Sequence, residues 1–152
     1  MIDQNISNKE LNGKHILGID FGTKFTGLAT YKVGNDPFVL TWGRIKYETD
    51  DQLIKDITAV IKDEFIDIVV IGVPFFTDGK ESTMTKTVKS FCDKLESQIS
   101  KPLHRVDETL TTFEAEERMK SSPKYNFKVD LKEIDALSAT IIIEQFCKNS
   151  SD

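Results

Sequence analysis

Three acidic side chains stand where the surrounding sequence pattern has no need of a charge. Asp20 interrupts the apolar run over 16–21, Glu108 follows a short apolar segment at 102–106, and Asp135 lies near the start of a long apolar helical pattern. A lone carboxylate in a buried strand costs several kcal/mol of desolvation unless it is paired or bound to a metal. Each acid also has a structural explanation, as a strand-end cap, a loop acid and a helix-dipole acid in turn. Their occurrence together favours a shared catalytic role over three separate structural roles.

Such acids can meet if the fold is right. The carboxyl ends of neighbouring parallel strands open onto one crevice, and a helix beginning above that crevice can add a third side chain. Converging carboxylates without histidine or cysteine suit Mg²⁺ or Mn²⁺. Two such ions, roughly 3.5–4 Å apart, can activate a water and stabilise the leaving oxygen in phosphodiester cleavage. Asp20, Glu108 and Asp135 are therefore the candidate catalytic and metal-binding residues.

Other catalytic arrangements find little support. The chain has two histidines, His15 and His104, and two cysteines, Cys92 and Cys147, with no CxxC. We expect the cysteines to be buried thiols and exclude a zinc site. The GxSxG, P-loop and GxGxxG sequences are absent.

Phosphate binding has two candidate segments. The turn after Asp20 contains Gly22, Thr23 and Lys24, and its backbone amides could bind an anion, although hairpin chemistry explains the same residues. The net charge of −5 argues against nucleic acid, but the charge is segregated. Residues 48–67 carry seven acids and two bases, whereas 118–132 carry five bases, including Lys124 and Lys128, and one acid. A local basic patch attracts phosphates more than the total charge repels them, although a solvated basic loop is the alternative.

The elements that must position these residues follow from hydrophobic periodicity. We predict strands at 15–21, 25–33, 38–45, 67–74 and 102–106, and helices at 50–65, 84–99, 111–120 and from Asp130 to Cys147. Two capping-box patterns, Thr111 with Glu114 and Asp130 with Glu133, are expected to open the last two helices. The order βββαβαβαα predicts an α/β fold, a mixed sheet with helices on both faces.

The length and the beginning of the chain set broad expectations. The 152 residues suit one domain, which we place at 14–149 after a flexible lead-in at 1–13. No apolar stretch approaches the roughly 18 residues of a membrane span. The polar first dozen residues lack the apolar centre of a secretory signal, so we expect a cytoplasmic protein with no membrane partner.

Four sequence blocks, in order, carry a resemblance to a known family. GIDFGTKFTGLA, VVIGVPFFTDGKES, VDETLTTFEAE and IDALSA run from about His15 to Phe146 and resemble the YqgF/RuvX family. The resemblance implies a ribonuclease-H-like fold with a five-stranded mixed sheet. It also implies a nuclease that processes the 5′ end of the precursor of 16S ribosomal RNA, or a Holliday-junction resolvase. By motif, the family's catalytic acids correspond to Asp20, Glu108 and Asp135.

Two positions depart from the family pattern. Phe25 stands where the family usually has arginine after the lysine of the first block, and Thr109 stands where the third block usually has arginine. Both changes remove a guanidinium that could bind phosphate bidentately. Lys24, Arg105 and the basic 118–132 segment are the candidates to compensate.

Together these observations predict a metal-dependent nuclease that acts on structured RNA, such as a ribosomal precursor, or on branched DNA. We expect Thr23, Lys24, Lys124 and Lys128 to contact nucleic acid, and Thr111 and Thr112 to cap a helix. A junction resolvase, which needs a two-fold dimer, and a non-catalytic nucleic-acid-binding module are the alternatives. An actin-like ATPase needs two lobes, whereas this chain is long enough for one. Whether the protein is a monomer or a homodimer stays open.

Overall fold

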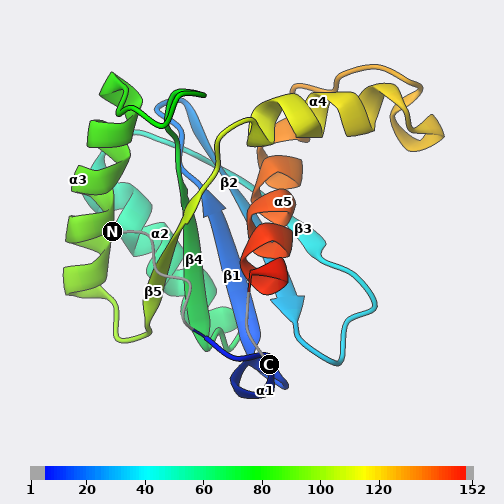
Figure 1. The fold of residues 1–152 in the computed structure, drawn as a ribbon. Helices are drawn as coiled ribbons and strands as arrows, with labels where there is room; N and C mark the ends of the chain where they lie inside the picture. The colour runs from blue at the N-terminus through cyan, green and yellow to red at the C-terminus, as the bar shows by residue number, and fades with distance from the viewer. Residues whose placement is uncertain (1–5, 150–152) are drawn as a thin grey trace.

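The computed structural model describes residues 6–149, and Figure 1 shows their arrangement. In chain order the elements are α1 (Asn8–Leu11), β1 (His15–Asp20), β2 (Phe25–Lys32), β3 (Leu40–Lys46), α2 (Asp50–Asp63), β4 (Ile68–Val73), α3 (Thr83–Gln98), β5 (Leu103–Asp107), α4 (Thr111–Lys120), the 3₁₀ turn η1 (Pro123–Tyr125) and α5 (Ile134–Lys148). The predicted order βββαβαβαα is confirmed, with α1 and η1 as short additions.

The five strands form one mixed sheet in the order β3-β2-β1-β4-β5. The β1–β2 and β2–β3 pairs are antiparallel, whereas β1–β4 and β4–β5 are parallel. The carboxyl ends of β1, β4 and β5 therefore lie at one edge of the sheet, which we call the carboxyl edge. Asp20 ends β1 and Asp107 ends β5 at this edge.

Helices cover both faces of the sheet, as predicted (Figure 1). The helices α2 and α3 bury residues such as Ile57 and Phe91 in one core cluster. The helix α5 packs on the other face, where Ile142 and Phe146 belong to a second cluster. Because α5 begins at the carboxyl edge and runs down the sheet, its first turn is held beside the ends of the strands. The helix α4 extends sideways from that edge.

The predicted cap at Thr111 is wrong. The N-cap position of α4 is Leu110, whose φ of 68° is left-handed, and no side chain caps the helix. The reason is a tight local turn, in which the Asp107 carboxylate accepts hydrogen bonds from the backbone and hydroxyl of Thr109. The Thr111 amide then donates to the Glu108 carbonyl over 2.9 Å. Thr111 thus becomes the first helical residue, while Thr112 is exposed on the next position.

The predicted capping box at Asp130 is also wrong. The helix α5 has Glu133 at its N-cap without a side-chain hydrogen bond. The Asp130 carboxylate instead accepts a hydrogen bond from the Lys132 amide, and the backbone carbonyl of Asp130 accepts one from the Ile134 amide. The carboxylate is used within its own turn, so the helix starts later than the pattern predicts.

Part of the expected lead-in has a regular structure. Asn8–Leu11 forms α1, capped by Ser7, and Leu11 is buried in the same cluster as α5. Residues 1–5 of the lead-in lie outside the described part of the chain. Across residues 6–149, no helix has both the length and the apolar character needed to cross a bilayer.

Candidate active site

The carboxyl groups of Asp20 and Glu108 meet at the carboxyl edge. Glu108, directly after β5, is only 8% exposed, and it shares a side-chain hydrogen bond with Asp20. Burial raises the pKa of Asp20 to about 6, a rise that the Glu108 hydrogen bond opposes and the charge of Asp135 increases. Burial, the Asp20 charge and the same hydrogen bond raise the pKa of Glu108 well above its usual value. Burial thus favours the neutral form of both acids, and the Asp20 charge favours it further at Glu108.

A glycine on the strand between them makes this contact possible. β4 lies between β1 and β5, and a Cβ atom on Gly72 would lie 2.8 Å from the Glu108 carboxyl carbon. The Glu108 amide donates to the Val73 carbonyl over 3.1 Å, which holds its backbone against β4. The bare surface of Gly72 thus leaves the space that the Glu108 side chain occupies.

A second glycine brings Asp135 to the same edge. Gly27 pairs with Asp20 in the sheet register, and a Cβ on Gly27 would lie 1.9 Å from the Asp135 carbonyl oxygen. The first turn of α5 therefore rests directly on the strand residue beside Asp20. Burial raises the pKa of Asp135, and Arg44, whose Nη1 lies 4.0 Å from an Asp135 carboxylate oxygen, opposes that rise.

The structure brings two of the three predicted acids into contact and leaves the third nearby. Within residues 6–149, no group of three or more His, Cys, Asp or Glu side chains is close enough to hold a metal ion as positioned. The donor chemistry nonetheless fits a hard divalent cation, since Asp20 and Glu108 face one another with carboxylate oxygens alone. These two residues would hold Mg²⁺ or Mn²⁺, with Asp135 at the margin of the site.

A cavity of about 350 Å³ opens beside the carboxyl pair. Asp20 and Glu108 form part of its lining, and the remainder is mostly apolar: Phe21, Pro74, Phe75, Met84, Thr109, Leu110, Thr111, Thr112 and Phe113. Leu110 and Phe113 are both 60% exposed. Sequence reasoning missed these two residues, although apolar side chains directly after an acidic turn were an available signal. Exposed apolar side chains beside two carboxyl groups suit the stacking of a nucleobase.

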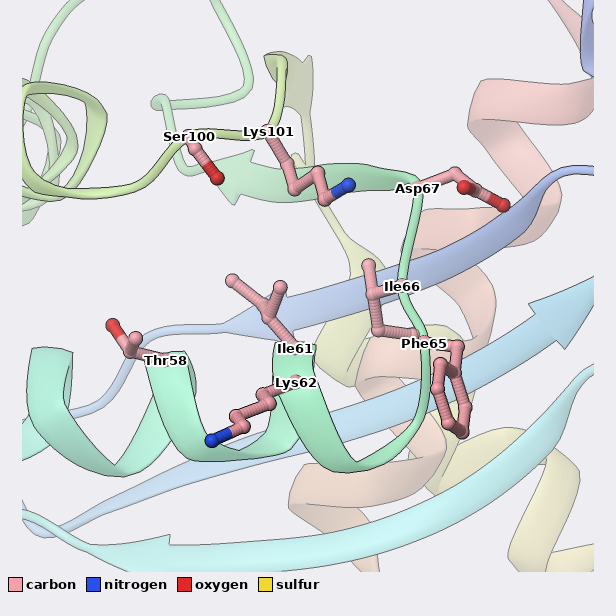
Figure 2. Close-up of a pocket in the computed structure, with 8 residues that line it drawn as sticks. All are labelled: Thr58, Ile61, Lys62, Phe65, Ile66, Asp67, Ser100 and Lys101. Carbon is pink, nitrogen blue, oxygen red and sulfur yellow. The ribbon is translucent and has the colours of Figure 1, made fainter.

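Another hollow, of about 390 Å³, lies at the opposite edge of the sheet (Figure 2). Its lining consists of Thr58, Ile61, Lys62, Phe65, Ile66, Asp67, Ser100 and Lys101. The one carboxylate there, Asp67, accepts a hydrogen bond from the His15 amide over 2.9 Å. That acid has a structural partner, so this hollow lacks the paired acids that distinguish the carboxyl edge.

The predicted nucleic-acid contacts lie in two places. Thr23 and Lys24 are exposed in the turn between β1 and β2, directly after Asp20. Lys124 and Lys128 are exposed beyond α4, on the segment that extends from the carboxyl edge in Figure 1. The two pairs lie on separate segments on the carboxyl-edge side of the fold.

Arg105, a candidate to replace the missing family arginines, is paired with acids of α3. Its guanidinium donates to Asp93 over 2.8 Å and lies 3.7 Å from Glu96, both on α3. Arg118 is held in the same manner by Glu114 and Glu144. The guanidinium nearest to the site acids belongs instead to Arg44 on β3, which sequence reasoning missed because no motif marks it.

Comparisons with known proteins agree with this geometry. A family model described as RuvX: Holliday junction resolvase matches residues 14–149. A protein of Maridesulfovibrio salexigens named "Putative pre-16S rRNA nuclease" is 33% identical over 132 residues, which cover 85% of this chain and 94% of that protein. A protein of Crocosphaera subtropica with the same name is 32% identical and covers 86% of this chain and 90% of its own length.

Solved structures share the fold at low sequence identity. RuvC of T. thermophilus, in complex with a Holliday junction substrate, superposes with a TM-score of 0.58 at 12% identity, covering 89% of this chain and 95% of that one. The yeast mitochondrial Holliday junction resolvase Ydc2 superposes with a TM-score of 0.56 at 12% identity, covering 95% of this chain and 80% of that one. The predicted ribonuclease-H-like α/β fold is confirmed.

Proposed function

Because the chain belongs to the RuvX family, we propose that it is a metal-dependent nuclease that hydrolyses phosphodiester bonds at the carboxyl edge. The observation that carries this proposal is the contact between the carboxyl groups of Glu108, which is buried, and Asp20, which is half-buried. Two acids are buried together at a cost unless a cation or a proton separates their charges. The pair is therefore a prepared site for a cation.

In this proposal Asp20, Glu108 and Asp135 are the catalytic acids and hold divalent ions, two of them as in other carboxylate nuclease sites. Bound Mg²⁺ or Mn²⁺ would supply an activated water and stabilise the charge on the leaving oxygen. The side chains have distinct tasks. Asp20 and Glu108 supply the facing oxygens, and Asp135 supplies a further carboxylate from the first turn of α5.

Nucleic acid would approach along the carboxyl edge. Thr23 and Lys24 would contact phosphates next to Asp20, while Lys124 and Lys128 would hold a more distant part of the backbone. Such contacts are insensitive to base sequence and depend on salt. The cavity beside Glu108 would receive an unstacked base against Phe113.

The substrate we propose is the 5′ region of the precursor of 16S ribosomal RNA, since the sequence relatives from M. salexigens and C. subtropica are named as pre-16S rRNA nucleases. A ribosomal substrate requires the enzyme to work where ribosomes are assembled, so the proposal includes a cytoplasmic location.

A Holliday junction is the second candidate substrate. It is favoured by the RuvC complex, a structure of the same fold with a junction bound. Symmetric cutting of a junction needs two active sites related by a two-fold axis, and hence a homodimer. An RNA-processing role is compatible with a monomer. A strictly monomeric protein in solution would therefore count against the junction as substrate.

The test assays the purified protein on both substrates in parallel, a 16S precursor transcript and a four-way DNA junction, with Mg²⁺, with Mn²⁺ and with EDTA. We expect metal-dependent cleavage of the transcript. Asp20→Asn should abolish it while preserving the folded state, as monitored by circular dichroism. Substantial metal-dependent activity in Asp20→Asn, or binding without cleavage by the unaltered chain, would contradict the nuclease assignment. The second result would favour a non-catalytic binding module.

A further inference from the structure

Arg44 brings a guanidinium to the carboxyl edge from the outermost strand. It lies on β3, opposite Gly27 in the register, and Gly27 is in turn opposite Asp20. The guanidinium carbon lies 3.7 Å from the centroid of the Phe25 ring. Its Nη1 donates to the Leu131 carbonyl over 3.4 Å and lies 4.0 Å from the Asp135 carboxylate. Contacts from β2, from the segment before α5 and from α5 itself therefore hold this side chain.

These contacts leave much of the guanidinium available. Both polar contacts use Nη1, and within residues 6–149 Nε and Nη2 make no hydrogen bond or ion pair. A guanidinium carries five N–H donors in a rigid plane. The Arg44 side chain is 29% exposed, so its donors can reach a ligand from solvent. The contact with Asp135, at 4.0 Å, is too long for a hydrogen bond.

The other two arginines of the chain differ in this respect. Arg105 faces Asp93 and Glu96, and Arg118 faces Glu114 and Glu144, so each is engaged by two carboxylates. Arg44 is held mainly by the Phe25 ring, which orients a guanidinium without consuming a donor. An oriented cation with open donors suits bidentate binding of a phosphate.

We propose that Arg44 is a phosphate-binding residue, which contacts the nucleic-acid backbone beside Asp135, and that Phe25 is the platform that orients it. This inference rests on the proposed nuclease function. Phe25 stands where the family pattern has an arginine, and the guanidinium lost there is supplied from β3. The ligand is one phosphodiester group of the substrate strand.

The test measures binding separately from cleavage. A fluorescein-labelled transcript of the 16S precursor 5′ region is titrated with the Asp20→Asn protein in EDTA at several salt concentrations. Adding Arg44→Ala should weaken binding about tenfold and lower the slope of log affinity against log salt by about one. Arg44→Lys should retain the slope and lose part of the affinity, because a lysine cannot bind bidentately. Phe25→Leu should give an intermediate loss.

The matched control is Lys62→Ala, which removes one exposed charge at the opposite edge of the sheet and should leave the binding unchanged. Thermal unfolding verifies that each variant is folded. An affinity and salt slope unaltered by Arg44→Ala would overturn the inference while leaving cleavage by the parent protein intact. If the unaltered protein does not cleave the transcript and the Asp20→Asn protein does not bind it, the proposed function and this inference are both overturned. If binding depends on Arg44 but the unaltered protein does not cleave the transcript, the phosphate contact is supported and only the nuclease assignment is overturned.

Discussion

The carboxyl groups of Asp20, at the end of β1, and Glu108, directly after β5, meet across β4, the strand that lies between β1 and β5. The fold places these acids in contact before any substrate is present. Such an arrangement lowers the stability of the metal-free protein at neutral pH, because two buried carboxyl groups cannot both ionise without cost. The electrostatic cost and the capacity for a cation have the same structural origin.

The first prediction concerns pH and stability. The pKa of Asp20 is raised from 3.8 to about 6 on folding, so the folded state holds its proton more tightly than the unfolded state. The contribution of Asp20 is therefore greatest below pH 4 and is lost as the pH rises through 6. The loss is on the order of 2–3 kcal/mol. Urea unfolding of the wild type in EDTA, relative to Asp20→Asn, should show this decline, and Mn²⁺ should reverse it above pH 6. A difference that stays constant from pH 4 to 7 would contradict the buried pair.

The second prediction concerns the glycines under the acids. Gly72→Ala would push against the side chains of Ile142 and Glu108, which can shift, and should cost about 1–3 kcal/mol of stability and most of the cleavage activity. Gly27→Ala would meet the Asp135 backbone at 1.9 Å, and backbone cannot turn aside. Chemical denaturation should therefore show the larger loss for Gly27→Ala. Equal, negligible losses at both positions would mean that the acids are not held by this close packing.

The third prediction concerns the apolar wall of the cavity. Phe113→Ala should weaken binding of single-stranded RNA by about 1–3 kcal/mol, because stacking of a base on the ring is lost. The matched control is Phe65→Ala, which removes an even more exposed phenylalanine at the opposite edge. Fluorescence anisotropy with the Asp20→Asn background provides both affinities. If the two variants bind equally, no base occupies the cavity.

The fourth prediction concerns the basic segment beyond α4. The double variant Lys124→Ala and Lys128→Ala should lower affinity for RNA and reduce the salt slope by about two, with little change in kcat. Both lysines are exposed, so removing them should leave the unfolding midpoint unchanged. The equivalent double variant at Lys62 and Lys101, at the opposite edge, controls for net charge. A salt slope that responds equally to both double variants would rule out a specific contact by this segment.

Helices and strands were predictable because their signals are local. The spacing of Leu53, Ile57 and Ile61 predicts α2, and all three are buried in its core cluster. The predicted cap at Thr111 was wrong because the turn at Glu108 places Leu110 at the N-cap and Thr111 inside the helix, where its hydroxyl is buried without a hydrogen-bond partner among the described residues. The predicted cap at Asp130 was wrong because its carboxylate accepts a hydrogen bond from the Lys132 amide, and Glu133 stands at the N-cap. Cap patterns therefore predict a helix start only where the preceding turn leaves the patterned residue at the N-cap position.

The sequence by itself determined which acids interrupt apolar segments, since a charge in such a segment is visible as a break in periodicity. Only the tertiary structure decided that Glu108 reaches Asp20 over Gly72, and that Asp135 stands apart beside Arg44. These relations depend on strand order, register and the space left by glycines on elements distant in the chain. Packing between such elements is a property of the whole fold, and no local pattern carries it.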